Sequence, residues 1–264
     1  MGSVTYPLRE RDWSTVERDY FTSNPFNYAV LDDFLEPDAC EGLRRQLLDH
    51  WGWHYKSPQA KELYLRQPPD VGLTWELASA LKSAVPRVIG PHAFVEHWAF
   101  MHNHNTGLAP HSDVGAVSVD LWLTPEQFNA DPQSGGLILY DVKRPTELSV
   151  FEFQTRRWAG EYLLRETRGR SQTIGYAFNR AIIFDARTFH RSDRMSFGAT
   201  TDAYRMNFSL LFDDPVVYRE RPGAYARRFE VFAALAAARQ VDVDSLPLDV
   251  AEELWEEAGA RVKP

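Results

Sequence analysis

The chain contains 264 residues, of which 44% are hydrophobic and 25% are charged, an ordinary composition for a globular protein. Its formal net charge of −8 disfavours a nucleic acid as partner, and its single cysteine, Cys40, excludes a disulfide framework and a zinc site made only of thiolates. No apolar stretch has the length of a signal-peptide core or of a membrane span, so we expect a cytoplasmic protein with no membrane partner.

The N-terminal part of the chain predicts one strand and two helices. Residues 27–34, NYAVLDDF, form the predicted strand. Pro37 stands at the first turn of the next element, where apolar residues recur at helical spacing: Leu43, Leu47, Leu48 and Trp51. A second amphipathic helix is indicated by Leu77, Leu81 and Val85. Cys40 lies in the first helix, so we expect a half-buried structural thiol rather than a reactive one.

The chain from about residue 92 to residue 213 has a different pattern, because short apolar runs rich in Val, Ile, Phe and Trp are separated by Gly, Pro, Asn and Asp. Six of these runs predict strands: 93–102, 115–123, 135–141, 171–178, 181–186 and 204–212. One helix is expected to interrupt them, over residues 156–166.

Helical periodicity returns after residue 222. An apolar stripe is formed by Tyr225, Phe229, Phe232, Ala233 and Ala236. A short acidic helix is predicted near residues 248–258. Helices that flank at least six strands favour a β-sandwich or barrel buttressed by helices, and the absence of repeats and long linkers favours one domain.

The stretch APHSDVG, residues 109–115, places a histidine and an aspartate two residues apart. On a strand, His111 and Asp113 point the same way and Ser112 points the other way. Such neighbours cannot form a Ser-His-Asp triad, in which the base lies between the nucleophile and the orienting acid, and no G-x-S-x-G motif occurs. The pair instead supplies two ligands of a facial metal triad, or forms a capped turn after Pro110.

Two downstream residues favour the metal site over the capped turn. His190 ends the run AIIFDARTFH, which we interpret as a buried strand leading into a polar loop, and is a candidate third ligand. In YRMNFSLLF, alternation places Arg205, Asn207 and Ser209 on one face of a strand. An arginine that faces the interior requires an anionic partner, and a guanidinium suits a carboxylate. The alternative is an exposed arginine on an edge strand.

These residues resemble the Fe(II)/2-oxoglutarate-dependent oxygenases, and the segments LWLTPEQFNADPQSGGLILYD, NRAIIFDARTFHRSD and YRMNFSLLFDD are similar to their bacterial, prolyl-hydroxylase-like branch. The resemblance covers about residues 95–215. It implies a mainly β protein with flanking helices and a double-stranded β-helix (jelly-roll, cupin-like) core. We expect one oxygenase domain over residues 1–264, with the β core at about 92–213 and buttressing helices at about 36–85 and 223–259.

The resemblance also implies a site and a reaction. The Fe(II) ligands would be His111, Asp113 and His190. Arg205 would bind the distal carboxylate of 2-oxoglutarate, with Ser209 as a hydroxyl partner, unless Ser209 is only a small residue in a tight wall, and with His102 as a further contact. No catalytic residue is implied beyond the iron centre. The implied enzyme uses O2, oxidises its substrate and releases succinate and CO2. Asp113 stands where family halogenases have a small residue, which favours hydroxylation, desaturation or cyclisation.

Other metal sites remain open at this level. His102-x-His104 resembles the H-x-H motif of cupin dioxygenases and isomerases. A zinc hydrolase can also use two histidines and an aspartate, but that reading leaves Arg205 without a role. A non-catalytic binding barrel leaves the coincidence of His111, Asp113 and His190 unexplained.

The expected substrate is a small molecule, such as an amino acid or a natural-product intermediate, and a protein or peptide side chain is the alternative. Candidate walls of the site are residues 54–70, 124–135 and 143–175, the first of which suits either a mobile lid or a surface loop. Trp98 and Trp122 either contact the substrate or belong to the core.

Overall fold

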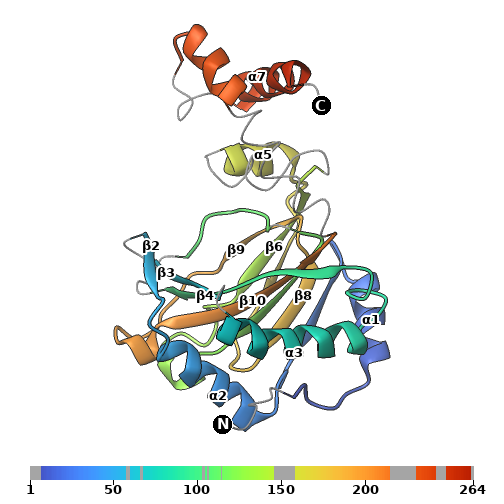
Figure 1. Ribbon diagram of the computed structural model, residues 1–264, viewed down its shortest axis with the longest axis vertical. Coiled ribbons are helices and arrows are strands. Elements are labelled where there is room, and N and C mark those ends of the chain that lie inside the picture. The colour runs from blue at the N-terminus through green and yellow to red at the C-terminus, as the bar shows by residue number, and fades with distance from the viewer. Residues whose placement is uncertain are drawn as a thin grey trace.

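Two antiparallel β-sheets, packed face to face, form the centre of the computed structural model (Figure 1). The structure describes residues 7–57, 60–65, 68–102, 105, 107–113, 115–145, 158–214, 230–241 and 248–262. The larger sheet contains β1 (Tyr28–Leu31), β2 (His54–Ser57), β3 (Ala60–Tyr64), β4 (Ala93–His102), β5 (Val117–Trp122), β8 (Ala181–Asp185) and β10 (Arg205–Asp213). The smaller sheet contains β6 (Leu137–Lys143), β7 (Ser171–Ile174) and β9 (Thr188–Ser192). The strand orders are β1-β8-β5-β10-β4-β3-β2 and β7-β6-β9.

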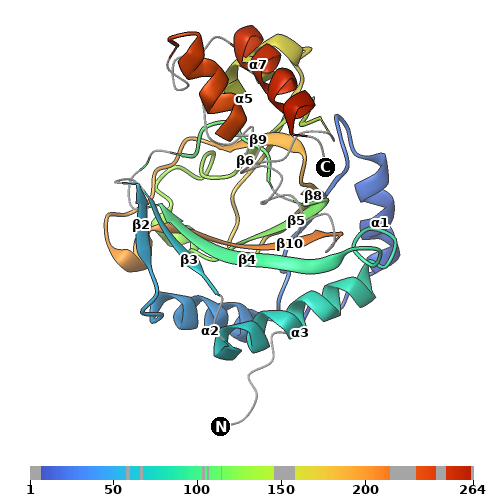
Figure 2. The ribbon, with the colours of Figure 1, turned by 45° about the horizontal axis from the view of Figure 1, so that its top comes forward.

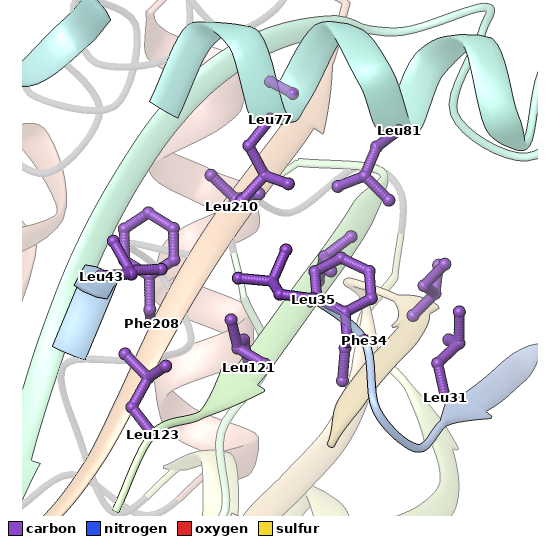
Figure 3. Packing of buried hydrophobic residues seen from close by; sticks show 14 of the residues in the cluster. Leu31, Phe34, Leu35, Leu43, Leu77, Leu81, Leu121, Leu123, Phe208 and Leu210 are labelled. Carbon is purple, nitrogen blue, oxygen red and sulfur yellow. The ribbon is translucent and has the colours of Figure 1, made fainter. Parts of the chain in front are cut away.

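The face of the larger sheet that points away from the smaller sheet carries the main hydrophobic core. Side chains alternate along β10, so Phe208 and Leu210 point toward this face. The helices α2 (Pro37–Leu48) and α3 (Pro68–Ala84) cover it (Figure 2). The helices contribute the buried leucines Leu43, Leu77 and Leu81. These leucines lie in the same hydrophobic cluster as Phe208 and Leu210 of the sheet (Figure 3). Removal of this apolar surface from water holds the helices on the sheet.

The other face of the larger sheet points toward the smaller sheet and is partly polar. On β10 this inner face holds Arg205, Asn207 and Ser209, as alternation predicts. Arg205 lies opposite His102 of β4, and Ser209 lies opposite Asp120 of β5. Apolar residues fill the remaining interior: Trp122, Leu137, Leu139, Ile174, Tyr176, Ile182, Phe184, Met195 and Phe197. The expected fold class, a mainly β protein with flanking helices and a jelly-roll core, is confirmed.

The segment that carries His190 differs from the prediction. We expected a strand over residues 181–186 that leads into a polar loop at His190. Strand β8 ends at Asp185, close to that prediction, but after a short turn residues 188–192 form a second strand, β9. Asp185 explains the turn, because its Oδ1 accepts the backbone N–H of Arg187 at 3.0 Å. His190 therefore lies within a strand of the smaller sheet, opposite Leu139 of β6.

Two N-terminal segments form elements that the sequence patterns did not predict. Helix α1 (Trp13–Thr22) is capped by Asp12, whose Oδ1 accepts the N–H of Ser14 at 3.1 Å. Much of the segment expected as a lid or surface loop forms the strands β2 and β3, and β3 pairs with β4. Only Ala60 and Leu63 of β3 are buried, three residues apart, so the two-residue signature of a strand is missing there.

A separate layer beside the sheets is formed by the C-terminal helices together with α5 from the middle of the chain (Figure 1). It contains α5 (Trp158–Glu166), helical residues 230–238 and α7 (Leu248–Arg261). One apolar cluster joins the last two helices: Phe232, Leu235, Ala236, Leu254, Trp255 and Ala258. The ring of Tyr162 on α5 packs on this cluster and also stacks on Phe189 of β9, with centroids 5.8 Å apart. This aromatic contact ties the helical layer to the smaller sheet.

The predicted C-terminal stripe is found in part. Phe232 and Ala236 are fully buried, whereas Tyr225 and Phe229 lie outside the described residues. The acidic helix expected near residues 248–258 is α7. None of the helices in the described part of the chain has both the length and the apolar character needed to cross a bilayer.

Cys40 in α2 is fully buried, whereas its sequence context predicted half-burial. Burial raises the pKa of its thiol to about 12, so almost no thiolate forms at neutral pH. We expect iodoacetamide at pH 8 to leave Cys40 unmodified in the folded protein and to alkylate it fully in guanidinium chloride, as measured by intact mass spectrometry. Rapid alkylation of the folded protein would contradict this buried position.

Candidate metal centre

The segment that contains the H-x-D motif is held by backbone hydrogen bonds. His111 and His190 donate to each other's carbonyl oxygens at 2.9 and 2.8 Å, forming one antiparallel bridge. The N–H of Asp113 donates to the carbonyl of Ala186 at 2.8 Å. We expected the motif on a regular strand, whereas only His111 of residues 111–113 takes part in a β-bridge. These bonds nevertheless fix where both side chains begin.

The three predicted metal ligands converge at one point. The candidate ligand atoms of His111, Asp113 and His190 all lie within 4.8 Å of one another. Oδ1 of Asp113 is 3.9 Å from Nε2 of His111 and 3.7 Å from Nε2 of His190. The structure therefore brings together residues that the sequence places on two separate segments.

The backbone determines which nitrogen of each histidine faces this point. Nδ1 of His111 lies 2.8 Å from the carbonyl oxygen of Ala109, and Nδ1 of His190 lies 2.9 Å from that of Thr188. Since a carbonyl oxygen only accepts, each Nδ1 carries the proton and each Nε2 presents a lone pair. Burial lowers the pKa of His190, which keeps this ring in its neutral, ligating form. Both rings are thus prepared to bind a metal through Nε2.

Asp113 is supported by side chains that the sequence did not reveal. Ser118 Oγ donates to Oδ2 of Asp113 at 2.8 Å, which leaves Oδ1 facing the histidines. The buried Arg144 donates from Nε to Ser112 Oγ at 3.2 Å and from Nη2 to the carbonyl oxygen of Asp113 at 3.4 Å. The serine inside the motif therefore helps to anchor the loop. Such supporting contacts orient metal ligands and raise their affinity.

A second carboxylate, that of Asp120, is buried on the inner face of β5. Burial and, after it, the nearby Asp113 raise the pKa of Asp120 to about 6, although the hydrogen bond from Ser209 Oγ, 2.5 Å long, lowers it. Asp120 was missed by the sequence analysis. Its signal was nevertheless present, because VSVDLW places Ser118 and Asp120 at alternate positions of an otherwise apolar strand.

Arg205 is buried, with only 2% of its surface exposed. Nε donates to the carbonyl of Gly135 at 2.5 Å, Nη2 to that of Gly136 at 3.5 Å, and Nη1 to Oδ1 of Asn207 at 3.4 Å. Among the described residues, no carboxylate oxygen lies within the 4.0 Å of an ion pair with this guanidinium. Burial lowers the pKa of Arg205, so a neighbouring anion would relieve the cost of the buried charge.

The two tryptophans named from the sequence occupy different surroundings. Trp122 is 1% exposed, stacks on Tyr176, and has its ring centroid 5.5 Å from Cζ of Arg205, so it forms the wall behind the arginine. Trp98 lies on the inner face of β4, is half-buried, and packs on Leu211 of β10. Of the two, only Trp98 offers surface to a substrate.

Ser209 and His102 both lie on the inner face beside Arg205. Ser209 donates its proton to Asp120. His102 is buried directly opposite Arg205 in the strand register. The position of His102 is compatible with the predicted cosubstrate contact, whereas Ser209 already uses its one proton on Asp120 and would have to release it to donate to a carboxylate. His104 lies outside the described residues.

Comparison with known proteins identifies the fold. No family model and no curated protein matches the sequence. The epimerase SnoN from nogalamycin biosynthesis, described as non-heme and alpha-ketoglutarate-dependent, has a TM-score of 0.53 at 14% identity, over 76% of this chain and 83% of that chain. A 2OG-Fe(II) oxygenase family oxidoreductase from Burkholderia pseudomallei has a TM-score of 0.52 at 8% identity, over 81% and 95%. A Pseudomonas putida prolyl-4-hydroxylase has a TM-score of 0.51 at 12% identity, over 77% and 100%.

The chain therefore has the fold of the Fe(II)/2-oxoglutarate-dependent oxygenases. The similar structures include a prolyl hydroxylase, in line with the branch that the sequence motifs resemble. SnoN has also been solved in complex with Fe3+, alpha-ketoglutarate and nogalamycin RO. At these identities the similarity concerns the fold, so the chemistry of this chain has to be argued from its own residues.

Ser118→Ala tests the support of Asp113. The variant removes the hydrogen bond from Ser118 to Oδ2 of Asp113, and we expect Mn(II) affinity to fall by about tenfold to a hundredfold in calorimetric titrations. The matched control is Ser23→Ala, which removes a hydroxyl that lies within hydrogen-bond distance of the carbonyl oxygens of Asp19 and Tyr28, outside the cluster. Equal Mn(II) affinity in Ser118→Ala and the wild type would refute this role.

Proposed function

We propose that the protein is an Fe(II)- and 2-oxoglutarate-dependent dioxygenase that hydroxylates, or otherwise oxidises, a small molecule. The observation that carries this proposal is a His-Asp-His cluster in the same fold as a buried arginine with no carboxylate partner among the described residues. The cluster alone suits several metals. The buried arginine adds the requirement for a bound anion, which 2-oxoglutarate meets.

The donor set fits iron. His111, Asp113 and His190 would hold Fe(II) through two neutral imidazoles and one carboxylate, the combination used by non-heme Fe(II) oxygenases. With 2-oxoglutarate and O2, the bound iron supplies the oxidising chemistry, and succinate and CO2 are the co-products. The protein orients the ligands through Ser118 and the backbone carbonyls described above.

Arg205 would hold the distal carboxylate of 2-oxoglutarate. A guanidinium has five N–H donors, and three of those on Arg205 have acceptors on Gly135, Gly136 and Asn207. One donor remains on each terminal nitrogen, and such a pair binds a carboxylate in a bidentate manner. The ring of Trp122 shields the guanidinium from water, which strengthens the ion pair. His102 is a candidate for a further contact, and Ser209 would make one only if its proton turned away from Asp120.

The other metal sites considered from the sequence are less well supported. A zinc hydrolase would use the same three ligands but would leave the buried Arg205 without an anion. A cupin-type site would recruit His102. In the part of the chain that the structure describes, the potential metal ligands that cluster are His111, Asp113 and His190, without His102.

Arg205→Met tests the cosubstrate anchor, because methionine keeps apolar contacts but removes the charge and the donors. We expect the 2-oxoglutarate requirement to rise by about a hundredfold, since truncating one partner of a buried charge pair costs several kcal/mol. Metal affinity should change by less than threefold. Anaerobic titration with Fe(II) and 2-oxoglutarate, followed by a weak visible charge-transfer band, measures both.

Two controls accompany this titration. The band should be absent in His111→Ala and unchanged in Arg180→Met, which removes an arginine paired with Asp32. Equal loss of metal and 2-oxoglutarate binding in Arg205→Met would contradict the anchor. A wild-type protein that binds zinc stoichiometrically and gives no band would overturn the oxygenase assignment.

The surroundings of the cluster favour a small-molecule substrate. Trp98 on β4 and Tyr64 on β3 share the inner face, are half-buried, and have ring centroids 6.3 Å apart. Trp98 packs on Leu211, which lies opposite Ser118, the residue that holds Asp113. These rings therefore offer flat apolar surface close to the cluster, as small-molecule sites do. The compound bound to SnoN in its complex, nogalamycin RO, is likewise a small molecule.

A screen for substrate-dependent succinate release separates the candidate substrate classes. We expect release with free amino acids or natural-product intermediates, and release with peptide pools alone would establish a protein hydroxylase instead. With an active small molecule, Trp98→Ala should raise KM by about fivefold, because an aromatic contact contributes about 1 kcal/mol. Trp75→Ala, which alters an exposed tryptophan on α3, is the control. An unchanged KM in Trp98→Ala would exclude this residue from the substrate site.

A further inference from the structure

A chain of three hydrogen bonds joins Asp120 to Arg205 along the inner face of the larger sheet. Ser209 Oγ donates to Oδ1 of Asp120 at 2.5 Å, and Nδ2 of Asn207 donates to Ser209 Oγ at 3.2 Å. Nη1 of Arg205 then donates to Oδ1 of Asn207 at 3.4 Å. We name this chain the Asp120–Arg205 relay. Arg205, Asn207 and Ser209 occupy successive inward-facing positions of β10. Asp120 lies on β5, directly opposite Ser209.

Each hydrogen bond of the relay fixes the direction of the next one. The carboxylate of Asp120 accepts, so Ser209 uses its only proton there. Ser209 Oγ can then only accept from Asn207, whose amide must turn its NH2 group toward the serine. The carbonyl oxygen of Asn207 consequently faces Arg205, where it accepts an N–H. If the Asn207 amide were reversed, its NH2 group would face the N–H donors of Arg205, and no hydrogen bond could form there.

We propose that Asp120 is a positioning residue that acts through Ser209 and Asn207 to fix the guanidinium of Arg205. Asn207 holds Nη1 from one side, and the carbonyl of Gly135 holds Nε from the other. The plane of the guanidinium is thereby set before any ligand binds, and the remaining donors of its terminal nitrogens keep one direction. A prearranged fork loses less conformational freedom on binding a carboxylate. The identity of that ligand as 2-oxoglutarate rests on the proposed function.

The burial of Asp120 supports a role beyond packing. Its side chain stands in a strand whose six residues are all buried, where an apolar residue would avoid the penalty of a desolvated carboxylate. Its charge also favours the protonated form of the buried Arg205. Asp120 and Arg205 thus carry opposite charges at the two ends of one polar chain, joined through neutral groups rather than by a direct ion pair.

The relay is tested by the Kd of 2-oxoglutarate for the Mn(II)-loaded protein, measured by calorimetry. Asp120→Leu and Ser209→Ala should each raise this Kd by about tenfold, since each breaks the chain that orients Arg205. Ser209→Thr keeps the hydroxyl and Asp120→Asn keeps an acceptor, so both should stay within threefold of the wild type. Because all links act as one unit, the double variant Asp120→Leu/Ser209→Ala should lose no more than the larger single loss.

The same titrations can overturn the proposal. Losses that add in the double variant would mean that Ser209 and Asp120 act separately, as expected if Ser209 touches the cosubstrate directly. An unchanged Kd in Asp120→Leu would remove Asp120 from any positioning role. Ser23→Ala is the control: its hydroxyl lies at the carbonyls of Asp19 and Tyr28, outside the site, and the variant should keep the wild-type Kd.

A second readout needs no ligand. The Nε–H nuclear magnetic resonance signal of Arg205 should be protected from exchange in the wild type, because Nε donates to Gly135. It should shift or broaden in Asp120→Leu and Ser209→Ala, and stay in place in Ser23→Ala. If the Mn(II)-loaded wild type bound no 2-oxoglutarate, the proposed function would fail. The Nε–H signal would still test whether the relay positions Arg205. A signal unaffected by both relay variants would refute it.

Discussion

The two-residue period of β10 is the constraint on which both faces of the larger sheet depend. Phe208 and Leu210 enter the core beneath the helices, while Arg205 and Ser209 enter the space between the sheets. A register shift of one residue would exchange these two sets. The hydrophobic packing of one face therefore determines where a buried cation stands on the other, and the position of the arginine is stabilised by contacts that it does not itself make.

The metal cluster depends on the backbone in a different way. His111 and His190 lie far apart in the sequence. Reciprocal hydrogen bonds between their backbone groups set their relative positions. Carbonyl oxygens then orient both rings, and Ser118 orients the carboxylate of Asp113. Every ligand is thus held by at least one group outside the cluster. This prearrangement is the physical basis for assigning the cluster to metal binding rather than to a surface accumulation of polar residues.

The sequence predicted those parts of the site that depend on short spacing. His111 and Asp113 are two residues apart, and Arg205 stands out on an otherwise apolar strand, so alternation alone indicated their directions. The contact of Arg144 with the H-x-D loop was not predictable, because it joins residues that only the folded sheets bring together. The separate strand of His190 escaped prediction for a local reason, since Asp185 ends β8 with a side-chain turn inside an apolar run.

The bridge between His111 and His190 has a thermodynamic consequence. The two residues are about eighty positions apart in the chain, so a complete ligand set exists only after a long loop has closed and the strands have paired. An unfolded chain offers at most the local H-x-D pair. A metal ion bound to all three residues therefore binds the native state in preference to the unfolded state, and by mass action it shifts the folding equilibrium toward the paired sheets. In this fold, metal occupancy of the His111, Asp113 and His190 cluster and the stability of the paired sheets are thermodynamically linked.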